Sequence, residues 1–253
     1  MNPILISSPV RRSGTTLVQR LLTSARNTLI YGESCANDLV MFSNLIQYKE
    51  MYFNASKTWR NDQLRRVLDG QLNHWIPDLM PDIDEYLNAF KSSVLDLFKF
   101  YRDAANDSGN TIWGTKLPQW DVNNLNFIRQ LLPESKIIYI IRDIHDCLRS
   151  AKAIHMIQGE EGTLQFCQIW KHNKEYALQH FNGDNILHLT YEELINDPEQ
   201  ACNQIERFTG ANGIDVSILS HKVNTYADDS NQDGYVQPVE LSDADLELIQ
   251  RLN

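Results

Sequence analysis

A short polar stretch near the N-terminus has the residue types and spacing of an anion-binding loop. Residues 12–16 read RSGTT and lie between the apolar run at 4–8 and an amphipathic run that looks helical. A glycine lets the backbone approach an anion closely, and the N–H groups at a helix N-terminus point toward such an anion. We therefore expect a strand, a turn, and a helix that begins at Thr15 or Thr16, with an oxyanion held at the turn.

The stretch differs from the phosphate loop of nucleoside triphosphatases in one charged residue. A Walker A loop reads G-x-x-x-x-G-K-[ST], whereas Thr15 directly follows Gly14 here, so the lysine that would reach a transferred γ-phosphate is absent. Arg12 supplies positive charge from the other side of the glycine. The structural alternative is that Ser13 only caps the helix and the arginines are surface charges, because serine is a common N-cap residue.

A second junction between a strand and a helix combines an arginine with a hydroxyl group. Residues 136–152 read KIIYIIRDIHDCLRSAK, so Arg142 follows an apolar run and Ser150 lies eight residues later. At about 3.6 residues per turn, Ser150 is about two turns along the helix that Arg142 precedes. The two side chains could grip a further phosphate. The two junctions together predict a ligand with two separate anionic groups.

These motifs, in this order, resemble those of the sulfotransferase family, whose donor is 3′-phosphoadenosine 5′-phosphosulfate and whose nucleotide product is adenosine 3′,5′-bisphosphate. The resemblance implies that the RSGTT loop holds the 5′-phosphosulfate and that Arg142 and Ser150 hold the 3′-phosphate. A third stretch, at 186–210, is similar to the strand-x-YE-x-L-x-x-DP segment of the branch that includes tyrosylprotein sulfotransferases and many bacterial enzymes, where the tyrosine lies near the adenine nucleotide. The donor-binding residues expected from this resemblance are Arg12, Ser13, Gly14, Thr15, Thr16, Arg142, Ser150 and Tyr191.

Sulfuryl transfer needs cations at the leaving oxygen and a base at the acceptor proton, but it does not require a metal, and the sequence indicates none. Lys116 follows the strand-like TIWG and resembles the lysine that contacts the phosphosulfate bridge in the tyrosylprotein branch, so we expect Lys116 and Arg12 to be the cations. Glu33, in LIYGES, is the expected base by the same resemblance. A solvated lysine and a glutamate that merely favours a helix N-terminus are the alternatives.

Other sulfotransferases use a histidine as the base, so the histidines are the alternative candidates. His145 lies beside the 3′-phosphate motif and His188 lies inside an apolar run, so both look structural. His74 and His155 stay open as alternative bases.

Five short apolar runs would supply the strands that position these residues. They are rich in Ile, Leu or Tyr, and none alternates cleanly with polar residues, which is typical of parallel strands covered by helices on both faces. The predicted fold is therefore α/β, with three α/β/α layers and a central, mainly parallel sheet of the P-loop-like kind. The runs occupy residues 4–8, 28–31, 111–114, 136–141 and 185–189.

We expect one sulfotransferase domain over residues 1–253. Residues 34–106 have mostly helical spacing, interrupted by Pro77 and Pro81, and should form a helical insertion that serves as a lid or substrate wall. Residues 226–238 are acidic, polar and rich in turn formers, so they should form a mobile loop before a last helix that begins near Ser242.

Composition limits the partners. The chain has 23 basic and 33 acidic side chains and a net charge of −10, which argues against nucleic acid and long polyanions and mildly favours a neutral or cationic acceptor. The N-terminus acquires charge too early for a signal peptide, and no run of about 18 apolar residues predicts a membrane span, so a cytoplasmic location is expected. Four cysteines form no C-x-x-C pair that would indicate zinc or redox chemistry.

The sequence thus predicts transfer of a sulfuryl group from 3′-phosphoadenosine 5′-phosphosulfate to a hydroxyl or amine of a small-molecule acceptor, such as a natural-product alcohol, by in-line displacement. The oligomeric state stays open. One alternative is a P-loop kinase of small molecules, which should carry the absent lysine. The others are sulfation of a protein tyrosine or carbohydrate, and a nucleotide-binding regulatory protein that has lost the base.

Overall fold

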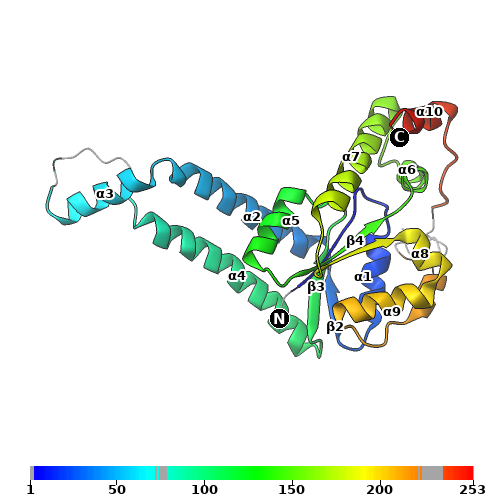
Figure 1. Ribbon diagram of the computed structural model, residues 1–253, viewed down its shortest axis with the longest axis horizontal. Helices are drawn as coiled ribbons and strands as arrows, with labels where there is room; N and C mark the ends of the chain where they lie inside the picture. The colour runs from blue at the N-terminus through cyan, green and yellow to red at the C-terminus, as the bar shows by residue number, and fades with distance from the viewer. Residues whose placement is uncertain (1–2, 72, 74–78, 222, 224–235, 253) are drawn as a thin grey trace, which may run out of the picture. The chain divides into compact units, whose positions relative to one another are not determined.

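A parallel β-sheet forms the centre of the protein in the computed structural model, which describes residues 3–71, 73, 79–221, 223 and 236–252. Among these residues five strands pair in parallel, and each predicted strand is confirmed to within two residues at either end. The sheet confirms the predicted α/β class (Figure 1). In spatial order the strands are β2 (Thr28–Tyr31), β3 (Ile112–Lys116), β1 (Ile4–Ser7), β4 (Lys136–Ile141) and β5 (Ile186–Thr190).

Helices cover both faces of the sheet, which is why its strands lack a polar side. Ile4 and Ile6 of β1 pack into one cluster with α1 (Thr15–Ser24) and α9 (Pro198–Thr209). Leu5, between them, is also fully buried, because successive side chains of a strand point to opposite faces. Helices α5 (Val122–Leu131) and α7 (Gly159–His180) lie on the other side of the sheet from α1 and α9 (Figure 1).

The strand order places several loops at one edge of the sheet. The strands are parallel, so the residues that follow β1, β2, β3 and β4 all lie at the carboxyl edge. The connection after β1 runs to β2 on one side, whereas β4 and β5 extend the sheet on the other. Ligands of open α/β sheets bind at such a switch point, outside the carboxyl ends of the strands. Both predicted phosphate motifs therefore lie where a nucleotide site is expected.

The chain divides into two compact units. One unit comprises Met1–Ala36 and Arg102–Asn253 and contains the sheet, and the other comprises Asn37–Tyr101. The second unit is built from most of α2 (Glu33–Asn54), α3 (Lys57–Leu68) and most of α4 (Ile83–Asp107). These helices occupy the stretch predicted as a helical insertion, and its role as a lid or wall of a single domain stays a prediction.

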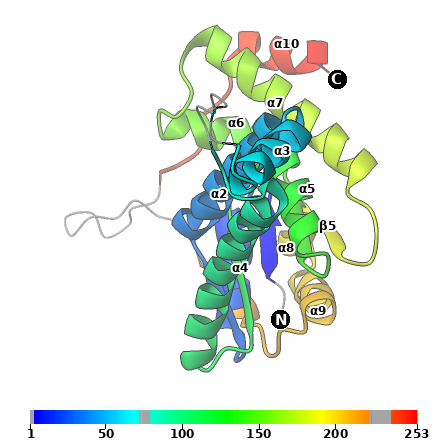
Figure 2. The same ribbon diagram turned by 90° about the vertical axis from the view of Figure 1, so that its left-hand side faces the viewer.

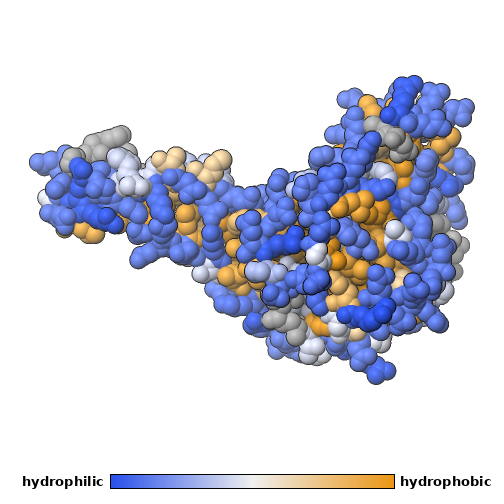
Figure 3. Space-filling model, viewed as in Figure 1, coloured by the Kyte–Doolittle hydropathy of each residue, from blue (hydrophilic) through white to orange (hydrophobic). Residues whose placement is uncertain are grey.

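Helix α2 carries apolar side chains on two opposite sides within the Asn37–Tyr101 unit. Leu39, Ile46 and Phe53 are buried. Hydrophobic side chains also reach the surface of this unit (Figure 3). On α2 these exposed residues recur at helical spacing, and they are Met41, Leu45, Tyr48, Met51 and Tyr52.

The C-terminal segment of the described chain, residues 236–252, packs against α6 (Ile144–Ala153) and α7. It contains α10 (Asp243–Leu252), which begins next to the predicted Ser242. The 3-10 helix η1 (Val216–Ser220), earlier in the chain, packs instead against α1 and α9. In both ribbon views α10 lies beside α7 (Figures 1 and 2). Most of the loop predicted at 226–238 lies outside the described residues. No helix in the described part of the chain combines the length and the apolar character needed to cross a bilayer.

Two ion pairs attach this C-terminal segment to α6. Lys152 Nζ lies 2.6 Å from Asp245 Oδ1, and Arg149 Nη2 lies 2.8 Å from Glu240 Oε1. Burial raises the pKa of Asp245, but hydrogen bonds from Lys152 and Ser242 outweigh that effect and hold the pKa below its ordinary value. The carboxylate form of Asp245 therefore stabilises the folded protein.

Candidate functional site

The loop after β1 has the backbone that an anion site needs. Arg12 and Gly14 both have left-handed dihedral angles, with φ of 72° and 100°, and α1 begins at Thr15 as predicted. The N-cap is Gly14, and no side chain caps the helix. Ser13 Oγ instead donates to the carbonyl oxygen of Val10 at 2.8 Å. The alternative of Ser13 as the cap is wrong, and the N–H groups of the first turn are left without a side-chain acceptor.

Gly14 is required by close packing as well as by its dihedral angles. A Cβ atom at this position would lie 2.7 Å from Cδ2 of Tyr191 and 3.2 Å from Cδ1 of Ile140. The guanidinium carbon of Arg142 lies 4.2 Å from the centre of the Tyr191 ring, in a cation–π contact. The tyrosine therefore contacts both the first motif, at Gly14, and the second, at Arg142.

Local capping explains why the second and third motifs fold as they do. Asp143, directly after Arg142, is the N-cap of α6 and accepts from the backbone N of His145 at 2.8 Å. Thr190 and Glu193 form a capping box that begins α8 (Tyr191–Asn196) directly at Tyr191. In the second motif the helix cap directly follows the site residue Arg142, and in the third motif the helix begins at the site residue Tyr191.

The two predicted phosphate sites are connected. Arg12 Nε donates to Ser150 Oγ at 3.0 Å, and Arg142 Nη1 donates to the carbonyl oxygen of Arg12 at 3.2 Å. Arg142 Nε is buried and has no hydrogen-bond partner among the described residues. A buried donor without an acceptor is costly, so an anionic ligand that accepts this hydrogen bond would remove the cost.

Lys116 and Glu33 meet at the same edge of the sheet. Lys116 Nζ donates to Thr16 Oγ1 at 3.1 Å and to Glu33 Oε1 at 2.5 Å. Lys116 is only 8% exposed, so the alternative of a solvated surface lysine is wrong. Glu33 is the first residue of α2, and its side chain is 44% exposed. The predicted cation and the predicted base therefore form one ion pair beside the RSGTT loop.

These residues line one cavity of about 660 Å³, a volume typical of nucleotide and cofactor sites. All the predicted site residues line it except Ser13, whose side chain is fully buried inside the turn. Residues that sequence reasoning missed also line the cavity. They are Arg11, Leu17, Pro118, Met156, Ile195, Leu219, Ser220, His221, Val223 and Pro238.

Among the cavity residues that the sequence analysis missed, one could have been predicted from its spacing to a motif residue, and others could not. Ile195 lies four residues after Tyr191, so it shares a face of α8 with the predicted tyrosine. Leu219 and His221 come from the end of η1 and the residue after it, a region without a motif. His221 is the one described histidine that lines the cavity. His188 Nε2 is 2.8 Å from the carbonyl oxygen of Phe181, and His74 lies outside the described residues.

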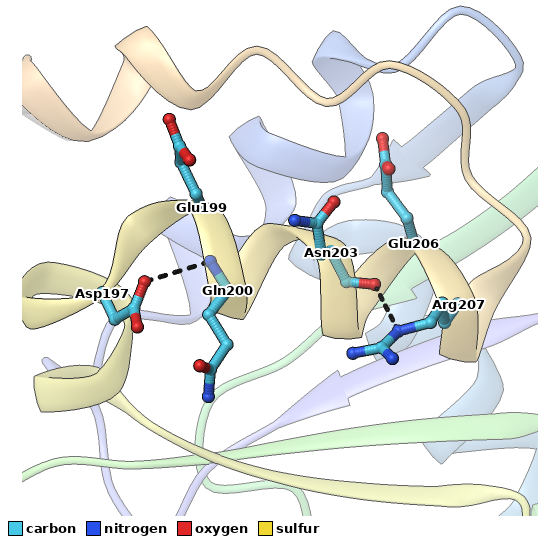
Figure 4. A pocket seen from close by; sticks show the side chains of 6 residues that line it. All are labelled: Asp197, Glu199, Gln200, Asn203, Glu206 and Arg207. Atoms are coloured by element: carbon cyan, nitrogen blue, oxygen red, sulfur yellow. Dashed lines mark hydrogen bonds between the residues drawn. The ribbon is translucent and has the colours of Figure 1, made fainter.

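A second hollow lies on the surface of α9 (Figure 4). Its side chains are mostly acidic or neutral, and several of its polar atoms are already engaged in hydrogen bonds within the protein. Asp197 accepts from the backbone N of Gln200 at 3.2 Å, and Arg207 Nε donates to the carbonyl oxygen of Asn203 at 3.3 Å. Such a surface is unsuited to a polyanionic nucleotide. No group of acidic, histidine or cysteine side chains in the described chain could hold a metal ion.

Comparison with known proteins agrees with this geometry. The chain matches the family described as "Sulfotransferase family" over residues 3–215. Among solved structures, it is similar to the sulfotransferase domain from the Synechococcus PCC 7002 olefin synthase, with 18% identity, a TM-score of 0.55, and coverage of 99% of this chain and 94% of that chain. Mouse sulfotransferase SULT7A1 complexed with PAP has 13% identity, a TM-score of 0.54, and coverage of 99% and 82%.

The two structural similarities show a shared fold at these identities, and a search of curated proteins found no match. The family match covers most of the chain, including all three motifs. The chain belongs to the sulfotransferase family, whose sulfuryl donor is 3′-phosphoadenosine 5′-phosphosulfate.

Proposed function

We propose that this sulfotransferase moves a sulfuryl group from 3′-phosphoadenosine 5′-phosphosulfate to a hydroxyl or amine of a small-molecule acceptor. The observation that carries the proposal is the buried, unpartnered Nε of Arg142 in a cavity that also contains the uncapped RSGTT loop. One cavity thus offers hydrogen-bond donors to two separate anionic groups. ATP, which has no 3′-phosphate, would leave the Arg142 donor without a partner.

The residues present fit this donor. The N–H groups at the start of α1, with Thr15 and Thr16, would hold the 5′-phosphosulfate, and Ser13 would contribute its backbone N–H because its hydroxyl is already used. Arg142 and Ser150 would hold the 3′-phosphate. Tyr191 would lie beside the adenine nucleotide, where the apolar Ile195, Leu219 and Val223 complete the lining.

The ion pair of Lys116 and Glu33 supports an in-line displacement. When bound, the donor supplies the sulfuryl group and a bridging oxygen that leaves with added negative charge. Lys116 Nζ, with Arg12, would stabilise that charge as the sulfur–oxygen bond breaks. Glu33 would accept the proton of the acceptor hydroxyl or amine as its oxygen or nitrogen bonds to sulfur. Glu33 Oε2 has no hydrogen bond among the described residues, so it can take the proton while Oε1 faces Lys116.

The acceptor class rests on charge. The protein has a net charge of −10, which supports a neutral or cationic small molecule, such as a natural-product alcohol, over a polyanionic carbohydrate. Sulfation of a protein tyrosine is the competing acceptor class. A panel of alcohols, amines and tyrosyl peptides, assayed for release of adenosine 3′,5′-bisphosphate, would separate these classes.

Ligand-dependent melting tests the donor. We expect adenosine 3′,5′-bisphosphate to raise the melting temperature without metal, and adenosine 5′-phosphosulfate and ATP to raise it less, because a ligand that binds only the folded state stabilises it in proportion to its affinity. A larger stabilisation by ATP with magnesium would contradict the proposal and favour a small-molecule kinase.

A further inference from the structure

Two side chains of α7 hold the backbones of both phosphate motifs. Trp170 Nε1 donates to the carbonyl oxygen of Arg142 at 3.1 Å. Asn173 Nδ2 donates to the carbonyl oxygen of Pro9, which precedes the RSGTT loop, at 2.8 Å. Trp170 and Asn173 are three residues apart, so they lie on one face of the helix. One helix face thus contacts both loops at points 133 positions apart in the sequence.

Helix α7 is itself firmly placed. Trp170 is 8% exposed and packs with Ile144, Cys147 and Leu148 of α6 in one hydrophobic cluster. The backbone carbonyl of Asn173 accepts from the Tyr139 hydroxyl of β4 at 3.2 Å. Because α7 is fixed to both the sheet and α6, its two donors hold the two loops at a set separation.

Neither Trp170 nor Asn173 lines the cavity, so neither would touch the donor. Their effect would pass through the backbone. The carbonyl of Arg142 lies where β4 ends, and its position determines where the guanidinium group begins. That guanidinium donates to the backbone of Arg12 through Nη1 and leaves Nε for a ligand. A small displacement of the Arg142 backbone would therefore misplace a donor whose hydrogen bond depends on distance and angle.

We propose that Trp170 and Asn173 are positioning residues, which hold the 3′-phosphate site and the 5′-phosphosulfate loop respectively, and that Trp170 thereby supports the selectivity of the enzyme for a nucleotide phosphorylated at both positions. This inference rests on the proposed function. Trp170 acts on the 3′-phosphate site through Arg142, and Asn173 acts on the 5′ loop through Pro9. The two substitutions should therefore have different effects on nucleotide selectivity.

Trp170→Phe removes the indole N–H and keeps an aromatic ring in the cluster. We expect it to lower the affinity for adenosine 3′,5′-bisphosphate about fivefold, the scale of one lost hydrogen bond, and to change the affinity for adenosine 5′-phosphate less than about twofold. Calorimetry measures both affinities. In an Arg142→Ala background, Trp170→Phe should have no further effect, because the group that it positions is absent.

Trp120→Phe is the matched control. Trp120 is 2% exposed, and its Nε1 has no hydrogen-bond partner among the described residues, so the same substitution there removes no hydrogen bond. It should leave the affinity ratio of the two nucleotides at the wild-type value. An equal fall of the ratio in both variants would overturn the positioning role of Trp170.

Asn173→Ala provides a second, independent variant because Asn173 is only partly buried and its loss should not prevent folding. We expect it to lower the affinities for both nucleotides by a similar factor and to leave their ratio unchanged. Wild-type affinities in this variant would contradict the inference for the 5′ loop. If the wild-type protein itself showed no preference for the bisphosphate, the proposed function would fail. If the wild-type protein prefers the bisphosphate and Trp170→Phe has the same affinity ratio as the wild type, the positioning role alone is overturned.

Discussion

The environment of Arg142 is the strongest indication that the ligand carries a second anionic group. Its side chain is largely buried, it stacks on Tyr191, and its Nε is left without an acceptor. We expect Arg142→Ala to weaken binding of adenosine 3′,5′-bisphosphate by more than about 1.5 kcal/mol, the scale of a charge-assisted hydrogen bond, as measured by calorimetry. Arg149→Ala, on the helix that follows Arg142 but outside the cavity, should leave the affinity unchanged. Equal affinities for both variants would remove Arg142 from the 3′-phosphate site.

Lys116 is predicted to act on turnover. Its ammonium group is buried beside Thr16 and Glu33, so it is held in place for a developing negative charge. We expect Lys116→Ala to lower kcat by about 100-fold or more, the scale of losing one preorganised electrostatic donor. Steady-state kinetics with a responsive acceptor measures the change. A variant that turns over at the wild-type rate would refute the leaving-group role.

Glu33 is predicted to act on the acceptor proton. Glu33→Gln keeps the shape of the side chain and a hydrogen-bond acceptor for Lys116, but it removes the base. Turnover should fall by about 100-fold or more, while calorimetry should show wild-type affinity for adenosine 3′,5′-bisphosphate. Glu50→Gln, further along α2 and paired with Lys91, is the control and should be fully active. Full activity of Glu33→Gln would reassign the base, and His221 would become the first histidine to test.

At the residue scale, the site residues that could be predicted from the sequence are those that lie in contiguous motifs. Arg12, Gly14, Arg142 and Ser150 converge as their spacing indicates, because each motif is one strand end joined to one helix start. The hydroxyl of Ser13 was not predictable in the same way, since its acceptor is a backbone carbonyl inside the turn. The cavity residues contributed by η1 depend on how distant parts of the chain pack, which no local pattern records.

At the scale of elements, the strands were predicted well because their signal is local. Buried parallel strands are continuous apolar runs, and β1, β2, β4 and β5 begin or end within one residue of the expected bounds. Strand β3 extends two residues further, so Lys116 is its last residue rather than part of a following loop. The tie between α6 and α10 joins Lys152 to Asp245 across 93 positions, and only the folded structure reveals it.

That tie predicts a pH-dependent stability. The pKa of Asp245 is lowered in the folded protein, so its contribution is present above the pKa of the unfolded chain and is lost as the pH falls through the folded pKa. We expect Asp245→Asn to lower the free energy of unfolding by about 1.5 kcal/mol at pH 7, and the difference from wild type to shrink as the pH falls below about 4.

Urea unfolding at several pH values measures this effect. The control is Glu247→Gln on the same helix, where an exposed pair with Arg251 should contribute less than about 0.5 kcal/mol. A destabilisation by Asp245→Asn that stays constant from pH 7 to pH 3 would show that the substitution acts through packing and not through the charge.

At the scale of the whole molecule, an acidic protein concentrates positive charge in one place. The described lining of the cavity includes Arg11, Arg12, Lys116 and Arg142, against the carboxylate of Glu33. The composition predicts such a local site, because an anionic donor must bind a chain with a net charge of −10. Composition alone does not say which of the basic residues gather there.

The division into two units predicts which part of the chain is stabilised when the nucleotide binds. All described residues that line the cavity belong to the unit that contains the sheet. Adenosine 3′,5′-bisphosphate should therefore slow amide hydrogen exchange around residues 9–16 and 142–150, and it should leave the exchange of Asn37–Tyr101 unchanged. Mass spectrometry of exchanged peptides reports both regions at once. Comparable slowing in Asn37–Tyr101 would mean that the nucleotide also orders the helical unit.

Because Gly14 lies so close to the Tyr191 ring, substitutions at these two positions should depend on each other during evolution. A side chain at position 14 can be accommodated only after the ring at 191 has been replaced by something smaller, because the Cβ atom and the ring would occupy the same space. The order of the two substitutions therefore matters, because a lineage that altered position 14 first would displace the Tyr191 ring that lines the cavity. A mutant library for this enzyme should vary both codons together.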